Sequence, residues 1–371
     1  MRLLDRYLMR ELIVPFAYCL CGFFIFWITF DLFNGLGNFQ RAHLNAAEVA
    51  YYYLIKSPEF LALVLPIALL LALLYALTTH ARHNELTAIR AAGVSLARIA
   101  MPYVAVGFIL SLALGAINEL WVPQSNDAAA ALLSRYATER AGTPQERKIW
   151  ERRVGFTNLR DNRQWFIQAY NLITDEMMQP YVFYYRQGIR HEVSAERGVF
   201  QQGSWIFTNA QELIFTGAPD PTRTVTKIRV MKEFNETPDQ IRSQIKVGKM
   251  DSLRSAAKAQ LSIKEIIDYQ QWHPEQSPRR RMLDTKLHGR IASPWTCLVV
   301  VLIALPFGAS TGRGNVYVGV ASSILICFCY YVLQQTALAL GSGGYVPPVL
   351  AAWAPNLLFS ATGLFLAWRA R

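Results

Sequence analysis

Six long apolar segments constrain the fold of this chain more than any other feature of its sequence. A helix that crosses the hydrocarbon core of a bilayer needs about 20 predominantly apolar residues. Three such segments precede the polar residues 121–288, and three follow them. The predicted spans are Leu12–Phe33, Phe60–Thr79, Ile99–Leu120, Ala292–Ser310, Val316–Leu340 and Val346–Ala370. We therefore expect an α-helical membrane protein with six transmembrane helices and a domain inserted between its halves.

Basic residues in the short loops predict the orientation, because Lys and Arg accumulate in cytoplasmic loops. One set of loops and both chain ends carry Arg2, Arg6, Arg10, Arg82, Arg90, Arg98, Arg313, Arg369 and Arg371. On the other side, the loops carry only Arg41 and Lys56, and residues 341–345 are uncharged. Both termini are therefore predicted to be cytoplasmic and the inserted domain to be outside. Its many Arg residues do not contradict this, because long domains are translocated largely regardless of charge.

The inserted domain is predicted to be an antiparallel β domain with flanking helical stalks, between membrane parts 1–120 and 289–371. Runs such as QWFIQAYNL and SWIFTNAQELIF are short, rich in aromatic and β-branched residues, and separated by DN and QG turns. This spacing is typical of a sandwich or an open barrel. A capping box, Ser262 with Glu265, predicts a later helix. All five cysteines lie in predicted spans, so the domain is expected to fold without disulfides.

Motifs for catalysis, metal binding or cofactor binding are missing from the sequence. There is no phosphate-binding G-x-x-x-x-G-K-[ST] loop, and no H-E-x-x-H, G-x-S-x-G or C-x-x-C motif. His80 and His83 lack a further ligand that would complete a metal site. Asp31 and Glu119 lie near span ends, where they form no obvious proton relay. We therefore expect no cofactor, no metal and no catalytic activity of the chain itself.

The loop between the second and third spans contains a short helix with defined ends. Asn84 is a predicted N-cap, Glu85 suits the positive end of the helix dipole, and Gly93 supplies a left-handed stop. The predicted helix, Glu85–Ala92, is only about 12 Å long. A helix this short is unstable alone in water, so it must dock against something.

Two interpretations of this helix remain open. Leu86 and Ile89 share one face, while Ala88, Ala91 and Ala92 would let a partner backbone approach closely. The helix is either an elbow that folds back on the spans or a coupling helix that binds a separate motor subunit.

At this point the sequence resembles the lipopolysaccharide-export permease family, LptF/LptG, over essentially its whole length. The similarity rests on LDRYLMRE (Leu4–Glu11), NELTAIRAAGVS (Asn84–Ser95), NELWVPQ (Asn118–Gln124), KIWERRVGF with QWFIQAY, LSIKEIIDY (Leu261–Tyr269) and YVPPVLAAWAPNLLF (Tyr345–Phe359). The LDRY, VPQ and PP elements are more similar to the LptG branch. The resemblance implies a periplasmic β-jellyroll-like domain and an inner-membrane location.

The resemblance also implies a function and partners. The chain would be the permease subunit of an ABC-type exporter that extracts lipopolysaccharide from the inner membrane and passes it to a periplasmic bridge. Its partners would be two copies of an LptB-like ATPase, a paralogous LptF-like permease and a single-span LptC-like protein. The first and fifth spans would line the lipid cavity. The residues implied in ATPase binding, within a coupling helix at 84–95, are Asn84, Glu85, Leu86, Ala88, Ile89, Ala91, Ala92 and Gly93.

One departure from the family concerns the lipid headgroup. LptG-like members often carry basic residues at the outer end of the first span, where this chain has Asp31. The remaining headgroup candidates are Arg41, Arg135, Arg279, Arg280 and Arg281, because Arg binds phosphate bidentately. The cluster at 279–281 could equally be part of a solvated helical stalk. Alternatively, the substrate has a less phosphorylated headgroup.

A different class of function is a membrane-anchored receptor or assembly scaffold whose β domain binds a periplasmic ligand. Co-purification separates the two hypotheses, because only a permease should bring a soluble ATPase with it. An integral-membrane enzyme would require a polar catalytic cluster that the sequence does not contain.

Overall fold

The computed structural model describes residues 3–141, 150–158, 160–172, 174–216, 220–248, 261–272, 278–310 and 316–369. Arg2, Arg313 and Arg371, which entered the orientation argument, lie outside these residues, as does part of the GAPDP turn. The chain divides into two compact units. The first contains Met1–Gly37, Ala46–Asp127 and Ser277–Arg371, and the second contains Asn38–Asn45 and Ala128–Gln276.

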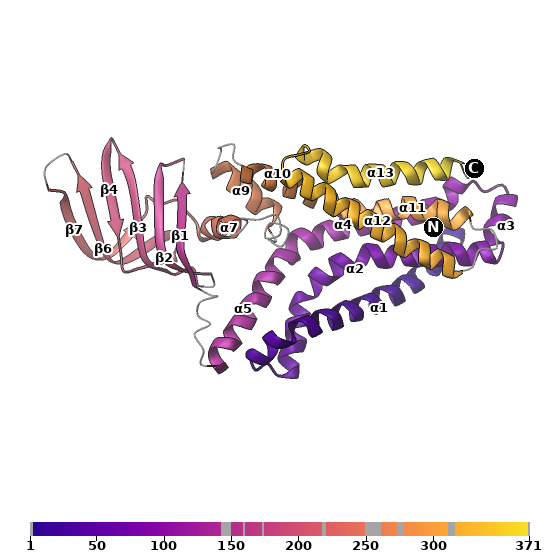
Figure 1. Cartoon of the computed structure of the whole chain (residues 1–371), viewed down its shortest axis with the longest axis horizontal. Helices are drawn as coiled ribbons and strands as arrows, with labels where there is room; N and C mark the ends of the chain where they lie inside the picture. The colour runs from indigo at the N-terminus through magenta and orange to yellow at the C-terminus, as the bar shows by residue number, and fades with distance from the viewer. Residues whose placement is uncertain are drawn as a thin grey trace. The chain divides into compact units, whose positions relative to one another are not determined.

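The first unit is a bundle of helices that run side by side (Figure 1). Its elements are α1 (Leu3–Arg41), α2 (Ala46–Arg82), α3 (Glu85–Ala91), α4 (Leu96–Ala116), the π-helical turn η1 (Ile117–Trp121), the start of α5 (Val122–Ala141), α10 (Pro278–Ala292), the 3-10 turn η2 (Ser293–Trp295), α11 (Thr296–Ser310), α12 (Val316–Ser342) and α13 (Pro348–Arg369). The end of α1 from Asn38 and the rest of α5 from Ala128 belong to the second unit. Among the described residues, six helical segments are long and apolar enough to cross a membrane, as predicted.

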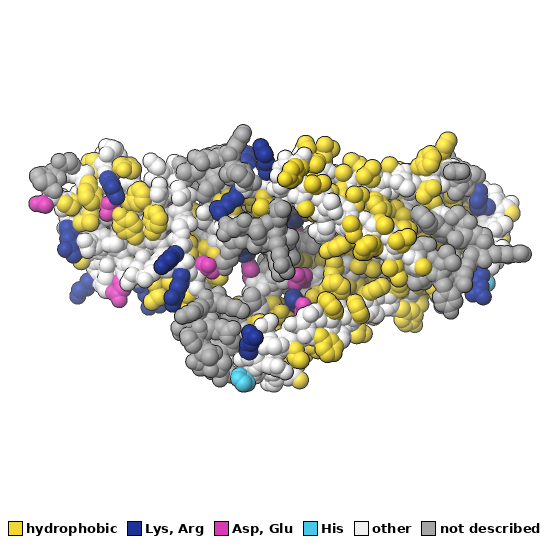
Figure 2. Space-filling model, viewed as in Figure 1, with side chains coloured by type: hydrophobic (Ala, Val, Ile, Leu, Met, Phe, Trp, Pro, Cys, Tyr) yellow, Lys and Arg dark blue, Asp and Glu magenta, His cyan; other side chains and the backbone are white. Residues whose placement is uncertain are grey.

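The burial of the spans shows which helix is central. In its most apolar window α2 is 61% buried, whereas α1 is only 6% buried. Leu69 and Leu73 of α2 are fully buried, with Tyr103 of α4 and Val301 of α11 in the same core cluster. Apolar side chains also cover much of the visible side of this unit (Figure 2). A bundle that is apolar on the outside as well as the inside is suited to lipid rather than water.

The second unit holds the inserted antiparallel β-sheet, which confirms the predicted fold class. Its strands are β1 (Trp150–Asn158), β2 (Arg163–Asn171), β3 (Met177–Arg186), β4 (Ile189–Ser194), β5 (Arg197–Gln201), β6 (Ser204–Phe215) and β7 (Thr222–Met231). Together β4 and β5 fill the place between β3 and β6, so the chain forms a meander in one sheet. Of the two predicted forms, the single sheet agrees with an open barrel rather than with a sandwich.

Two predicted QG turns set the register of this meander. Gln187 and Gly188 join β3 to β4, and Gln202 and Gly203 join β5 to β6. All four residues have positive φ, between 50° and 79°. This is the type I′ geometry whose twist matches two-residue hairpins.

One face of the sheet forms the core of the second unit. Trp165 and Trp205 are fully buried, and Phe234 packs edge-on to Trp165 with ring centroids 5.1 Å apart. Helix α7 (Pro238–Gly248) adds Ile241 and Ile245 to this core. Helix α9 (Ile263–Trp272) begins with the predicted capping box, in which the backbone N–H of Ser262 and of Glu265 each donate to the other's side chain, at 2.7 and 3.1 Å.

A buried carboxylate fastens the strands to the segment that follows β7. The fully buried Glu236 accepts from Asn158 Nδ2 at 2.8 Å and from Arg163 Nη1 at 2.7 Å. Its backbone carbonyl accepts from Trp205 Nε1 at 2.7 Å. Glu236 thus joins β1, β2 and β6. Because this unit has no cysteine, these hydrogen bonds link the strands where a disulfide cannot.

We predict that Glu236→Ala destabilises the excised segment 140–250 by roughly 3–5 kcal/mol, because it removes the nearer carboxylate partner of the buried Arg163 charge and leaves Asp161 at 3.5 Å. The wild-type segment should give a β-rich circular dichroism spectrum without any oxidant. The measurement is urea unfolding followed by tryptophan fluorescence. The matched control, Glu233→Ala, removes an exposed pair with Arg186 and should change stability by less than about 1 kcal/mol. Equal effects of the two substitutions would contradict this role of Glu236.

Candidate functional site

The short helix α3 begins at the predicted residue, Glu85, with Asn84 at the N-cap position. Asn84 adopts a left-handed conformation, with φ 57°, and its side chain makes no capping hydrogen bond, so the capping role expected of that side chain is absent. Instead, its backbone N–H closes the end of α2 by donating to the carbonyl of Ala81 at 3.1 Å. Asn tolerates this conformation better than most residues. Gly93 has φ 84° and supplies the predicted left-handed stop, one residue after the C-cap Ala92.

The two faces of α3 differ as the sequence predicts. Leu86 is buried and Ile89 packs against the helical core. Ala88, Ala91 and Ala92 are exposed. We call these three residues the small face of α3. Their short side chains leave the helix backbone open to close approach by another molecule.

The charged end of α3 is anchored inside the chain. Glu85 Oε2 accepts from the Tyr7 hydroxyl at 2.9 Å and lies 2.6 Å from His80 Nδ1. Partial burial alone would raise the pKa of Glu85, but the hydrogen bonds from His80 and Tyr7 lower it overall. Neither Tyr7 nor His80 was identified as the partner of Glu85 from the sequence. His83 binds the Thr79 carbonyl instead, and no cluster of three metal-binding side chains occurs in the described parts of the chain.

A second ion pair ties the start of α1 to the other side of the α3 loop. Arg98 Nη2, at the start of α4, lies 2.8 Å from Asp5 Oδ1. Ser95 caps α4 by accepting from the backbone N–H of Arg98 at 3.4 Å. The helices on both sides of α3 are therefore held against the first turns of α1.

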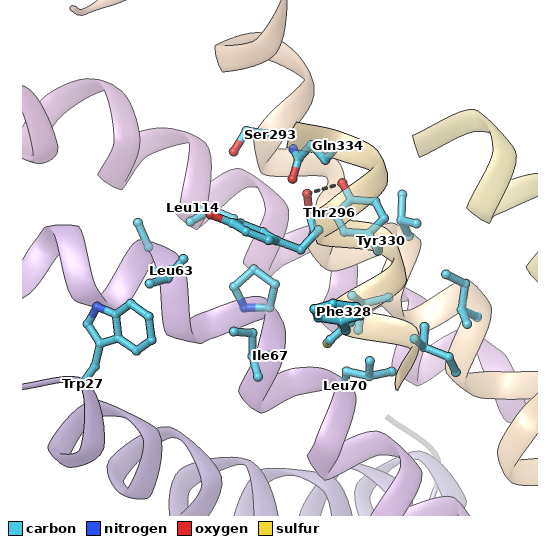
Figure 3. A pocket seen from close by; sticks show the side chains of 18 residues that line it. Trp27, Leu63, Ile67, Leu70, Leu114, Ser293, Thr296, Phe328, Tyr330 and Gln334 are labelled. Atoms are coloured by element: carbon cyan, nitrogen blue, oxygen red, sulfur yellow. Dashed lines mark hydrogen bonds between the residues drawn. The ribbon is translucent and has the colours of Figure 1, made fainter. Parts of the chain in front are cut away.

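A pocket of about 400 Å³ lies within the bundle (Figure 3). It is lined by Trp27, Ala62, Leu63, Pro66, Ile67, Leu70, Leu114, Ser293, Thr296, Val299, Val300, Ile303, Ile326, Cys327, Phe328, Tyr330, Tyr331 and Gln334. In Figure 3, Ser293 and Gln334 lie at one end, whereas Leu70 and Phe328 lie at the other. A mostly apolar cavity with polar groups at one end has the character of an amphiphile site.

The wall of the pocket is held by a buried hydrogen-bond network. The Tyr330 hydroxyl lies 2.8 Å from Thr296 Oγ1 and 2.5 Å from Asn356 Oδ1. Asn356 Nδ2 in turn donates to the carbonyl of Ala292 at 2.8 Å, where α10 gives way to η2. The network joins α11, α12 and α13, so it fixes the position of the α12 wall.

The acidic group near the C-terminal end of the first span is paired. Asp31 lies one turn after the pocket residue Trp27 and receives Lys56 Nζ at 3.1 Å. The Tyr53 hydroxyl also donates to Asp31, at 3.2 Å. The charge of Asp31 at this end of α1 is therefore neutralised by Lys56, a pairing that the sequence did not reveal.

The headgroup candidates fall into two groups. Arg41 ends α1 and Arg135 lies on α5, both exposed and both in the second unit. Arg279, Arg280 and Arg281 occupy the first turns of α10, whose helical path continues through η2 into α11. These last three are consecutive on one helix. Arg281 Nη1 lies 3.0 Å from the place that a Cβ on Gly344 would occupy, so its side chain covers the α12–α13 turn.

These features define a class of protein: a multi-pass helical membrane protein with an inserted β domain, an amphiphile-sized pocket and a short helix between its second and third spans. Residues 6–369 match the family described as "Lipopolysaccharide export system permease LptF/LptG", and the chain belongs to this family. It is therefore a non-catalytic transmembrane subunit of the ABC-type exporter of lipopolysaccharide. No curated protein matches the sequence.

We predict that the pocket contacts lipopolysaccharide. A photo-reactive residue at Ile67 should form an adduct with lipopolysaccharide in reconstituted vesicles, several-fold above the adduct from Leu357. Leu357, on α13, is 60% exposed and serves as the control that faces bulk lipid. Adducts at Leu357 should instead be dominated by phospholipid. Equal lipopolysaccharide labelling at the two sites would contradict the assignment of the pocket.

Proposed function

We propose that this chain couples ATP hydrolysis in a separate cytoplasmic subunit to the extraction of lipopolysaccharide through its membrane pocket. The observation that carries the proposal is α3, because its anchored face and its exposed small face are what a docking helix requires. The helix binds an LptB-like ATPase, two copies of which serve a pair of permease subunits. The apolar part of the pocket holds the acyl chains of the lipid, which enters from the bilayer.

The proposed orientation places α3 and both ends of the chain in the cytoplasm and the β unit in the periplasm. It is supported by the Arg residues around α3 and at the start of α1. The Tyr7–Glu85 and Arg98–Asp5 contacts put the N-terminal turns beside α3. The last turns of α13 lie at the same end of the bundle (Figure 1).

Two features support further subunits. The sparse burial of α1, with Phe26, Phe30 and Phe33 all more than half exposed, suits a second permease chain of the LptF kind. Strand β7 forms one edge of the sheet and exposes the apolar Val225 and Ile228. An open edge of this kind pairs readily with another β domain, such as that of an LptC-like protein or a periplasmic bridge. The LDRY, VPQ and PP elements support the LptG role.

We propose that Arg279, Arg280 and Arg281 contact the anionic headgroup at the outer membrane surface. Their position at the start of the helical path into the fourth span supports this role. The Asp31–Lys56 pair is neutral, which leaves only Arg41 as a positive charge at the end of α1, so the α10 cluster takes the place of further basic residues there.

We predict that Ala91→Arg on the small face weakens binding of the ATPase subunit at least roughly tenfold, because the long charged side chain prevents close packing. Ala47→Arg, at the opposite end of α2, is the matched control and should bind normally. The measurement is titration of the ATPase onto the permease complex in detergent or nanodiscs. Binding that survives Ala91→Arg unchanged would contradict the docking role and the cytoplasmic location of α3.

For the headgroup contact, replacing Arg279, Arg280 and Arg281 together with Gln should reduce lipid-stimulated ATPase activity without dissociating the complex. Each basic residue near an anionic surface contributes about 1 kcal/mol. The lipopolysaccharide concentration for half-maximal stimulation should therefore rise roughly tenfold or more. Substitution of Arg152, Arg153 and Arg160, three exposed residues of the β unit, removes the same charge as a control. Unchanged stimulation in the first variant would contradict the headgroup contact and would indicate that the cluster is part of a solvated helical stalk.

A further inference from the structure

The most informative cluster outside the pocket is the one at the charged end of α3. A single carboxylate oxygen, Glu85 Oε2, holds the Tyr7 hydroxyl of α1 at 2.9 Å and His80 Nδ1 of α2 at 2.6 Å. The Tyr7 and His80 rings also contact each other, with centroids 5.7 Å apart. We call these three residues the Glu85 joint. It is the point where three helices meet through one atom.

One member of the joint is buried, whereas Tyr7 and Glu85 are partly exposed. The His80 side chain is only 2% exposed, so it cannot turn to solvent for another partner. Its Nε2 is buried and has no hydrogen-bond partner among the residues that the structure describes. Because Nδ1 lies 2.6 Å from a carboxylate oxygen, that nitrogen carries the proton. Glu85 is thus the group that fixes the His80 ring.

The joint leads directly to the pocket along α1. This helix runs from Leu3 to Arg41, a length of about 58 Å at 1.5 Å per residue, and it contains Pro15 between Tyr7 and the pocket. Leu8 and Leu12 seat its first turns in the core, while the apolar window of the span is only 6% buried. Trp27, farther along, lines the pocket. A displacement of Tyr7 therefore moves α1, because few other contacts within this chain restrain that helix.

We propose that Tyr7 and His80 are positioning residues that fasten α3 to α1 through Glu85, so that a displacement of α3 is transmitted along α1 to the pocket. The proposal rests on the ATPase docking proposed above and deepens it. Glu85 then acts as a mechanical link within the chain, while the small face makes the contact with the motor. The Asp5–Arg98 pair restrains the same turns of α1 from the α4 side.

The test separates transmission from docking by measuring lipid released per ATP hydrolysed in proteoliposomes that contain the full complex and lipopolysaccharide. Tyr7→Phe keeps the ring and removes only the hydroxyl that reaches Glu85. We expect the ATPase to remain bound and to hydrolyse ATP, with the lipid-to-ATP ratio falling several-fold. Tyr18→Phe, at a 75% exposed position of the same helix, is the matched control and should leave the ratio unchanged.

A double-mutant cycle shows whether the residues act as one unit. Because Glu85→Gln removes the charge that orders both partners, Tyr7→Phe should have little further effect on the ratio in the Glu85→Gln background. A lipid-to-ATP ratio within twofold of wild type in Tyr7→Phe would overturn the proposed role of the Glu85 joint. So would loss of ATPase binding in that variant, because the hydroxyl would then shape the docking surface instead. Failure of the wild-type complex to bind the ATPase at all would overturn the proposed function itself.

Discussion

The absence of hydrogen-bonding partners in the hydrocarbon core is the constraint on which the rest of the bundle depends. A polar group of a span can therefore find a partner only within the protein. Asp31 is paired with Lys56, and Glu119 lies 3.5 Å from Arg290. The Tyr330 hydroxyl finds its partners on α11 and α13. Each of these contacts joins different helices, so the pairing that the bilayer demands also fixes which helices are neighbours and leaves the pocket between them.

The β unit meets a different constraint, because water surrounds it and its strands carry no cysteine. One sheet can bury only one face, and here that face is filled by tryptophan and phenylalanine rings. The buried Glu236 adds directed bonds to three strands. Such a group is costly to bury alone, but it is stable when every acceptor is occupied by a fixed donor. The order of this unit therefore depends on specific polar contacts as much as on apolar area.

The sequence predicted features that depend on local spacing, and it failed where distant residues compete. The six spans, the Ser262–Glu265 box, the QG turns and the Gly93 stop all follow from short patterns and are confirmed. The contact between Tyr7 and Glu85 joins residues 78 positions apart, so no local pattern could reveal it. Asn84 occupies the predicted N-cap position, but its side chain does not cap α3, because its left-handed backbone also ends α2. The single-sheet meander was left open because strand composition does not determine strand order.

The two faces of α3 depend on each other. A seven-residue helix has too few internal hydrogen bonds to persist alone, so its shape comes from the Leu86 contact and from Glu85. Partial burial opposes the charge on Glu85, yet the donors from Tyr7 and His80 hold its pKa below the usual range, so the carboxylate stays ionised at neutral pH. Charge-assisted bonds of this kind are stronger than neutral ones. A partner that binds the small face thus meets a helix that is already ordered, which reduces the entropy cost of docking. Because the same bonds order the helix and tie it to α1, the proposed docking surface and the proposed mechanical connection to the pocket depend on one arrangement.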